Sequence, residues 1–122
     1  MTATLAAKKS ETAPAADETI SRLVRAIVEE VRPEKIVLFG SRARGTQTPT
    51  SDVDLLVIES EPFGPGRSKF EELGRLYERL GGFGIAKDIL LYSRDEVEKW
   101  RSSINHVVAR ALREGKVLYA RP

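Results

Sequence analysis

Apolar residues recur along this chain with two different spacings, and the change between them marks the expected elements. Near the N-terminus they follow the i, i+3, i+4, i+7 pattern of a helix with one buried face. The positions that make this stripe are Ile20, Leu23, Val24, Ile27, Val28 and Val31. We expect Asp17 to cap the helix and Pro33 to stop it, so that the helix ends near residue 31.

The rest of the chain alternates between short apolar runs and amphipathic stretches. Residues 35–39, 53–58 and 85–92 are rich in β-branched and aliphatic side chains and are bounded by turns, which predicts strands. Helices are expected from 69 to 80, from 94 to about 101 and from 104 to 114, with a short final strand at 117–119. Ser68 with Glu71, and Ser93 with Glu96, fit the capping-box pattern. Phe70 and Trp100 are expected to be core aromatics.

This order of elements predicts one α+β domain, an α/β sandwich with a small mixed β-sheet and flanking helices. The length of 122 residues suits a single core, which we place at residues 17–122. Residues 1–16 are rich in Ala and Thr and almost free of bulky apolar side chains, so a disordered tail is expected there.

Composition narrows the class of protein. A formal net charge of +2 gives no strong field, so nucleic acid is not expected as a partner. The absence of cysteine excludes disulfides and thiolate metal sites and fits the cytoplasm. No apolar run approaches the ~18 residues that cross a bilayer, so no membrane association is expected.

Three carboxylates are candidates for a metal site. Asp52 and Asp54 open a predicted strand and, by strand alternation, point to the same side. Two carboxylates at such a short separation repel each other unless a cation lies between them, and Mg²⁺ prefers carboxylate oxygens as ligands. Asp88 interrupts an apolar run, where a buried charge is costly, and a neighbouring strand would bring it to the other two. Alternatively, Asp52 and Asp54 are solvated and Asp88 pairs with Lys87.

A glycine–serine turn precedes these carboxylates. Gly40 ends the strand at 35–39 and permits close approach of a ligand or a positive φ. If Ser41 begins a helical turn, its hydroxyl and the following amides form a phosphate cradle, to which Arg42 or Arg44 adds charge. The alternative is a turn with a purely structural role.

Taken together, these segments resemble a known signature. Gly40-Ser41, ten intervening residues and then Asp52-x-Asp54 before an apolar strand are similar to the motif of the DNA polymerase beta-like nucleotidyltransferase superfamily. The Gly-Ser-Arg-Ala-Arg-Gly form and the closing segment 109–119 resemble the minimal nucleotidyltransferases, or MNT proteins, of that superfamily. The similarity extends over residues 18–120.

The resemblance implies a fold and an activity. The fold would be the polymerase beta-like nucleotidyltransferase fold, and the chain an active enzyme that transfers a nucleoside monophosphate, AMP from ATP, to a hydroxyl group. It implies that Asp52, Asp54 and Asp88 hold Mg²⁺ or Mn²⁺, with Asp88 also activating the acceptor. Gly40 and Ser41 would hold the triphosphate with help from Arg42.

The resemblance also implies a partner. Larger members of the superfamily carry an extra domain for the acceptor, so here we expect the acceptor to be brought by a partner. MNT proteins are commonly antitoxins paired with a HEPN-domain toxin, which predicts adenylylation of that toxin within a hetero-oligomer. Two alternatives stay open: a non-catalytic module that silences a HEPN partner by binding, and a nucleotidyltransferase with a small-molecule or nucleic-acid acceptor. His106 is expected at the surface or at a partner contact.

Overall fold

The structure, a computed structural model, describes residues 13–122, and their side chains from residue 17. Its elements in chain order are α2 (Ala13–Val31), β1 (Lys35–Phe39), α3 (Ser41–Arg44), β2 (Val53–Glu59), α4 (Lys69–Leu80), the 3₁₀ turn η1 (Gly81–Phe83), β3 (Lys87–Ser93), α5 (Arg94–Trp100), α6 (Val107–Glu114) and β4 (Lys116–Ala120). The predicted α+β class is confirmed.

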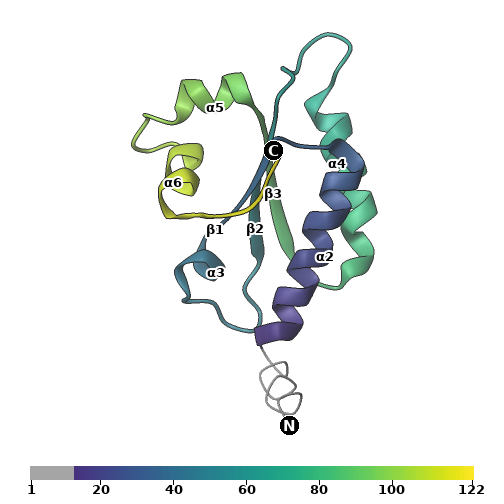
Figure 1. The fold of residues 1–122 in the computed structure, drawn as a ribbon, viewed down its shortest axis with the longest axis vertical. Coiled ribbons are helices and arrows are strands. Elements are labelled where there is room, and N and C mark those ends of the chain that lie inside the picture. The colour runs from purple at the N-terminus through teal and green to yellow at the C-terminus, as the bar shows by residue number, and fades with distance from the viewer. Residues whose placement is uncertain (1–12) are drawn as a thin grey trace.

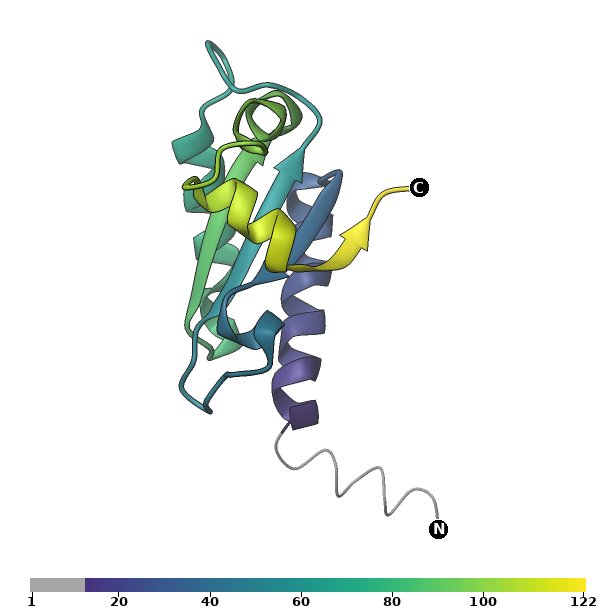
Figure 2. The ribbon, with the colours of Figure 1, turned by 90° about the vertical axis from the view of Figure 1, so that its left-hand side faces the viewer.

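The four strands form one mixed sheet in the order β3-β2-β1-β4. β1 runs antiparallel to both β2 and β4, whereas β2 and β3 are parallel and are connected through α4. Helices α2 and α4 cover one face of the sheet, and α5 and α6 cover the other, so the domain has three layers (Figure 1). Seen from the side, β4 lies at the edge of the sheet beside β1 and leads to the C-terminus (Figure 2).

Each face of the sheet has its own apolar cluster because strand side chains alternate between faces. On the α2 and α4 side, Leu23 and Ile27 of α2 are fully buried with Leu55 of β2 and Leu76 of α4. The α2 stripe is therefore confirmed. The α5 and α6 side is centred on Leu56 and Ile58 of β2, with Val97 of α5 and Val108 and Ala111 of α6.

Several local predictions need correction. Helix α2 begins at Ala13, so the expected cap at Asp17 was wrong. Most of the expected tail, residues 1–12, lies outside the described residues. Phe70 is 84% exposed rather than part of the core, because it lies in the first turn of α4, where no described element covers it. Trp100 is half-buried and stacks on His106 at 4.4 Å between ring centroids.

The two predicted capping boxes are confirmed to different extents. The Ser93 hydroxyl accepts from the Glu96 amide at the start of α5 while the Glu96 carboxylate accepts from the Ser93 amide, which is a complete capping box. At α4 only the Ser68 half is present. His106, which the sequence placed at the surface or at a partner contact, caps α6 by accepting at Nδ1 from the Val108 amide.

A buried pair of glutamates lies at the C-terminal end of β2. Glu59 and Glu72 are 4% and 5% exposed, and Arg67 forms an ion pair with both. Burial raises the pKa of Glu59 to about 8; the neighbouring carboxylate of Glu72 acts in the same direction, and Arg67 opposes them. Glu59 Oε2 has no hydrogen-bond partner among the described residues.

No helix in residues 13–122 is long and apolar enough to cross a membrane. What the sheet does provide is a convergence of strand ends. The C-terminal end of β1 lies beside the start of β2, because these strands are antiparallel, and the start of β3 lies beside the start of β2, because those are parallel. Three separate segments of the chain thus meet at one end of the sheet, where β1 ends and β2 and β3 begin.

Candidate active site

The first of these segments is the turn from β1 into the short helix α3. Gly40 connects them with φ 76° and ψ −158°, a backbone conformation that is almost confined to glycine. Its carbonyl accepts from the amides of Ala43 and Arg44, while helix geometry leaves the amides of Ser41 and Arg42 without a helical acceptor. The predicted helical turn at Ser41 is confirmed, and its first two amides are the donors that a helix leaves available to a ligand.

Asp54, the second residue of β2, lies directly against this turn. A Cβ atom added at Gly40 would be 2.3 Å from Oδ2 of Asp54 and 3.2 Å from its Cγ. No side chain fits between the two residues, so the glycine and the carboxylate are in close van der Waals contact. The register that pairs Phe39 with Asp54 across β1 and β2 produces this approach.

The three carboxylates of the sequence prediction lie near one another at this end of the sheet. Asp54 and Asp88 are register partners on the parallel strands β2 and β3, and Asp52 precedes β2 by one residue. Burial raises the pKa of the half-buried Asp54 above its ordinary value, and the negative charges of Asp88 and Asp52 raise it further. Arg44 acts in the opposite direction. The carboxylates are therefore close enough to repel one another.

The structure corrects the argument that selected Asp88. Its side chain is exposed, not buried, because Asp88 is the second residue of β3 and this strand is at the edge of the sheet. Asp52 is also exposed and lies just before β2, so strand alternation does not by itself orient it. The register of β2 with β3 places Asp54 beside Asp88, and Asp52 is near them because it is two residues before Asp54 in the chain.

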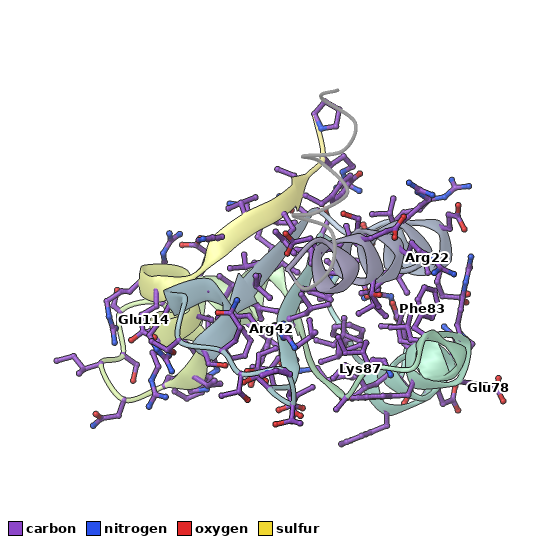
Figure 3. All side chains as sticks on the ribbon, turned by 90° about the horizontal axis from the view of Figure 1, so that it is seen from below. Arg22, Arg42, Glu78, Phe83, Lys87 and Glu114 are labelled. Carbon is purple, nitrogen blue, oxygen red and sulfur yellow. The ribbon has the colours of Figure 1, made fainter. Side chains whose placement is uncertain are left out.

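The two arginines of the turn have separate contacts. Arg42 Nε and Nη2 donate to the carbonyl oxygen of Ser51 at 3.2 and 2.8 Å, across the loop between α3 and β2. Arg44 Nη1 forms an ion pair with Glu114 of α6 at 3.3 Å, and its side chain is 48% exposed. Figure 3 looks onto this end of the domain, with Arg42 near the middle, Glu114 on the side of α6 and Lys87 on the side of α4. Sequence reasoning found neither Ser51 nor Glu114, since only the folded loop identifies them.

The donor set fits a divalent cation that binds together with a nucleotide. Within the described residues, no three His, Cys, Asp or Glu side chains surround a common point as a ready metal cage. Mg²⁺ seldom needs one, since it binds through one or two carboxylates together with substrate phosphates and water. A cation beside Asp54 would also offset the repulsion that raises its pKa.

Solved structures share this fold. A candidate nucleotidyltransferase from Sulfolobus solfataricus superposes with a TM-score of 0.50 at 23% identity, covering 88% of this chain and 87% of the other. A toxin–antitoxin structure with AMP-PNP has a TM-score of 0.52 at 21% identity, covering 83% of this chain and 73% of the other. A mutant of the toxin–antitoxin MntA–HpeT has a TM-score of 0.51 at 16% identity, covering 82% of this chain and 71% of the other.

Sequence comparison identifies the family. A candidate protein adenylyltransferase of Methanocaldococcus jannaschii, MJ1379, is 32% identical over 68 residues, which are 56% of this chain and 68% of that protein. The family model described as a nucleotidyltransferase domain matches residues 20–117, from the buried stripe of α2 into β4. With the glycine turn and the carboxylates both inside that match, the chain belongs to the nucleotidyltransferase family and is a nucleotidyltransferase enzyme.

Proposed function

We propose that this chain transfers AMP from ATP to a hydroxyl group of a partner protein, in a reaction that needs Mg²⁺ or Mn²⁺. The observation that carries the proposal is the contact between the Gly40 turn and Asp54, with Asp88 in register beside it. Phosphate-binding donors and metal-binding oxygens are thereby adjacent, as nucleotidyl transfer requires.

Each residue has a part in the step. Gly40 and Ser41, with the free amides at the start of α3, receive the triphosphate, and Arg44 adds positive charge from the same helix. The acceptor oxygen attacks the α-phosphorus, the bond from that phosphorus to the bridging oxygen breaks, and pyrophosphate leaves. The proton of the hydroxyl passes to Asp88, an exposed carboxylate on the edge strand β3.

Asp52, Asp54 and Asp88 would hold the metal. When bound, the metal supplies positive charge that lowers the pKa of the acceptor hydroxyl and neutralises the departing pyrophosphate. The tight contact with Gly40 restricts where the Asp54 carboxylate can point, so its oxygens are oriented before substrate arrives.

Two observations favour a protein as the acceptor. The similarity to MJ1379 is to a chain described as a candidate protein adenylyltransferase, and two solved structures of this fold are toxin–antitoxin assemblies. The exposure of Asp88 on an edge strand leaves room for a large acceptor. We therefore propose a HEPN-domain toxin as the acceptor and an antitoxin role for this chain, within the cytoplasm.

Labelled ATP tests the proposal. The chain is incubated with Mg²⁺, ATP labelled at the α-phosphate and a HEPN-domain protein. We expect label on that protein, no label when EDTA is present, and about 100-fold slower labelling with Asp54→Asn. Asp17→Asn, an exposed aspartate on α2, is the matched control and should label at the rate of the unsubstituted chain.

Other outcomes separate the alternatives. Label on a small molecule or on nucleic acid, with none on the protein, would keep the enzyme and reject the protein acceptor. If an Asp52→Ala/Asp54→Ala double variant suppressed toxicity as well as the unsubstituted chain and no label moved, the chain would be a binding module and the enzymatic antitoxin role would be wrong.

A further inference from the structure

We propose that Arg42 is a positioning residue for Asp52 and not a ligand of the triphosphate. This inference rests on the proposed function of the same site. It also departs from the sequence expectation, in which Arg42 assisted phosphate binding because it follows Gly40-Ser41.

The contacts of Arg42 point into the protein. Its Nε and Nη2 atoms both donate to the carbonyl oxygen of Ser51, at 3.2 and 2.8 Å, and the residue is half-buried. Two donors of one planar group on one acceptor fix the orientation of that group, because moving the guanidinium toward a phosphate breaks both bonds. Arg42 itself is held by α3, whose first turn is anchored on the Gly40 carbonyl.

Apart from the Arg42–Ser51 contact, few hydrogen bonds among the described residues fix the position of Asp52. The ladder of β2 with β3 starts at Val53, whose amide donates to the Ala86 carbonyl, so Asp52 lies outside the sheet. The preceding loop is exposed from Arg44 to Thr50. The start of this loop is attached to α3, because the Thr46 amide donates to the Ser41 carbonyl at 3.0 Å. The bonds from the Ser51 amide to the Thr48 carbonyl and from the Thr48 amide to Ser51 Oγ only fold its second half on itself.

The Arg42–Ser51 contact therefore connects the two halves of the site. It ties α3, where the triphosphate is proposed to bind, to the residue that immediately precedes Asp52. Arg44 remains the arginine suited to an anion, since one surface ion pair with Glu114 holds a side chain that is 48% exposed.

Hydrogen exchange and steady-state kinetics together test this assignment. In the nucleotide-free protein, Arg42→Ala should accelerate amide exchange at residues 48–53 about tenfold, because the loop loses its anchor. In the transfer assay, kcat should fall at least tenfold while KM for ATP stays within twofold, since a misplaced metal ligand impairs the chemical step. Arg42→Lys retains one donor and should restore part of both effects. Arg110→Ala, an exposed arginine on α6, is the matched control.

Each result decides the question. An increase in KM for ATP of tenfold or more, with kcat and loop exchange unchanged, would make Arg42 a phosphate ligand and overturn the inference. Unchanged loop exchange alone would also overturn it, because the anchor would then be dispensable. If the unsubstituted chain transferred no nucleotide, the proposed function would fail, whereas the exchange experiment would still report whether Arg42 fixes the segment before Asp52.

Discussion

Replacing Gly40 by alanine should damage the site far more than it damages the fold. The alanine would have to adopt φ 76° and ψ −158°, which costs on the order of 1–3 kcal/mol for a residue with a side chain. Its Cβ would also be 2.3 Å from Asp54 Oδ2, so the carboxylate must retreat by about 1 Å to restore van der Waals contact. A displacement of that size at a reacting centre can lower the rate about 100-fold.

Two measurements and one matched variant separate these effects. Urea denaturation gives the free energy of unfolding, and transfer from labelled ATP gives the rate. Gly45→Ala is the control because Gly45 also has a positive φ, of 80°, while nothing lies within 4 Å of the position that an added methyl group would take. Both variants should lose about 1–3 kcal/mol of stability, but only Gly40→Ala should lose most of its activity. Equal activity in the two variants would refute the claim that Asp54 must contact Gly40.

Three further predictions concern stability. The pKa of Glu59 is raised from 4.5 to about 8 in the folded protein, so the folded state keeps a proton that the unfolded state releases. The free energy of unfolding, measured by urea titration, should therefore fall by a few kcal/mol between pH 5 and pH 8, and Glu59→Gln should flatten that pH dependence. An unchanged pH dependence in Glu59→Gln would contradict the shared burial of Glu59 with Glu72. Ser93→Ala removes the buried cap of α5 and should cost about 1–2 kcal/mol in the same assay; a loss below about 0.3 kcal/mol would show that the cap is unimportant. Tyr77→Phe removes the hydroxyl that accepts from the Ile89 amide at 2.8 Å and should cost about 1 kcal/mol, with faster exchange at that amide; protection equal to that of the unsubstituted protein would argue against the bond.

Periodicity in the sequence was sufficient for most of the fold. The stripe from Ile20 to Val31 has one buried face because its spacing matches the helical repeat, and the runs at 35–39 and 53–58 became β1 and β2 almost without change. Phe70 continues the same stripe as Leu73 and Leu76, yet it is exposed. A hydrophobic pattern shows which side of a helix is apolar, but not where the neighbouring elements stop covering it.

The residue types of the candidate site can be read from the sequence, but their geometry cannot. The turn at Gly40 and the carboxylates are visible in the chain, whereas the register of Asp54 with Asp88 depends on how α4 returns the chain to the sheet. The donors of Arg42 satisfy a carbonyl nine residues away, which no local pattern indicates. The strand predicted at 53–58 stopped one residue short of Glu59, which is the last residue of β2 and is buried near Glu72.

We propose that nucleotide and metal bind between the Gly40 turn and the carboxylates. A crystal structure of the chain with Mn²⁺ and α,β-methylene ATP, with the metal located by its anomalous signal, tests this most directly. We expect a Mn²⁺ peak within coordination distance of Asp54 and of at least one of Asp52 and Asp88, with the triphosphate against Ser41 at the start of α3. A Mn²⁺ peak away from Asp54, or a triphosphate bound elsewhere on the domain, would contradict it.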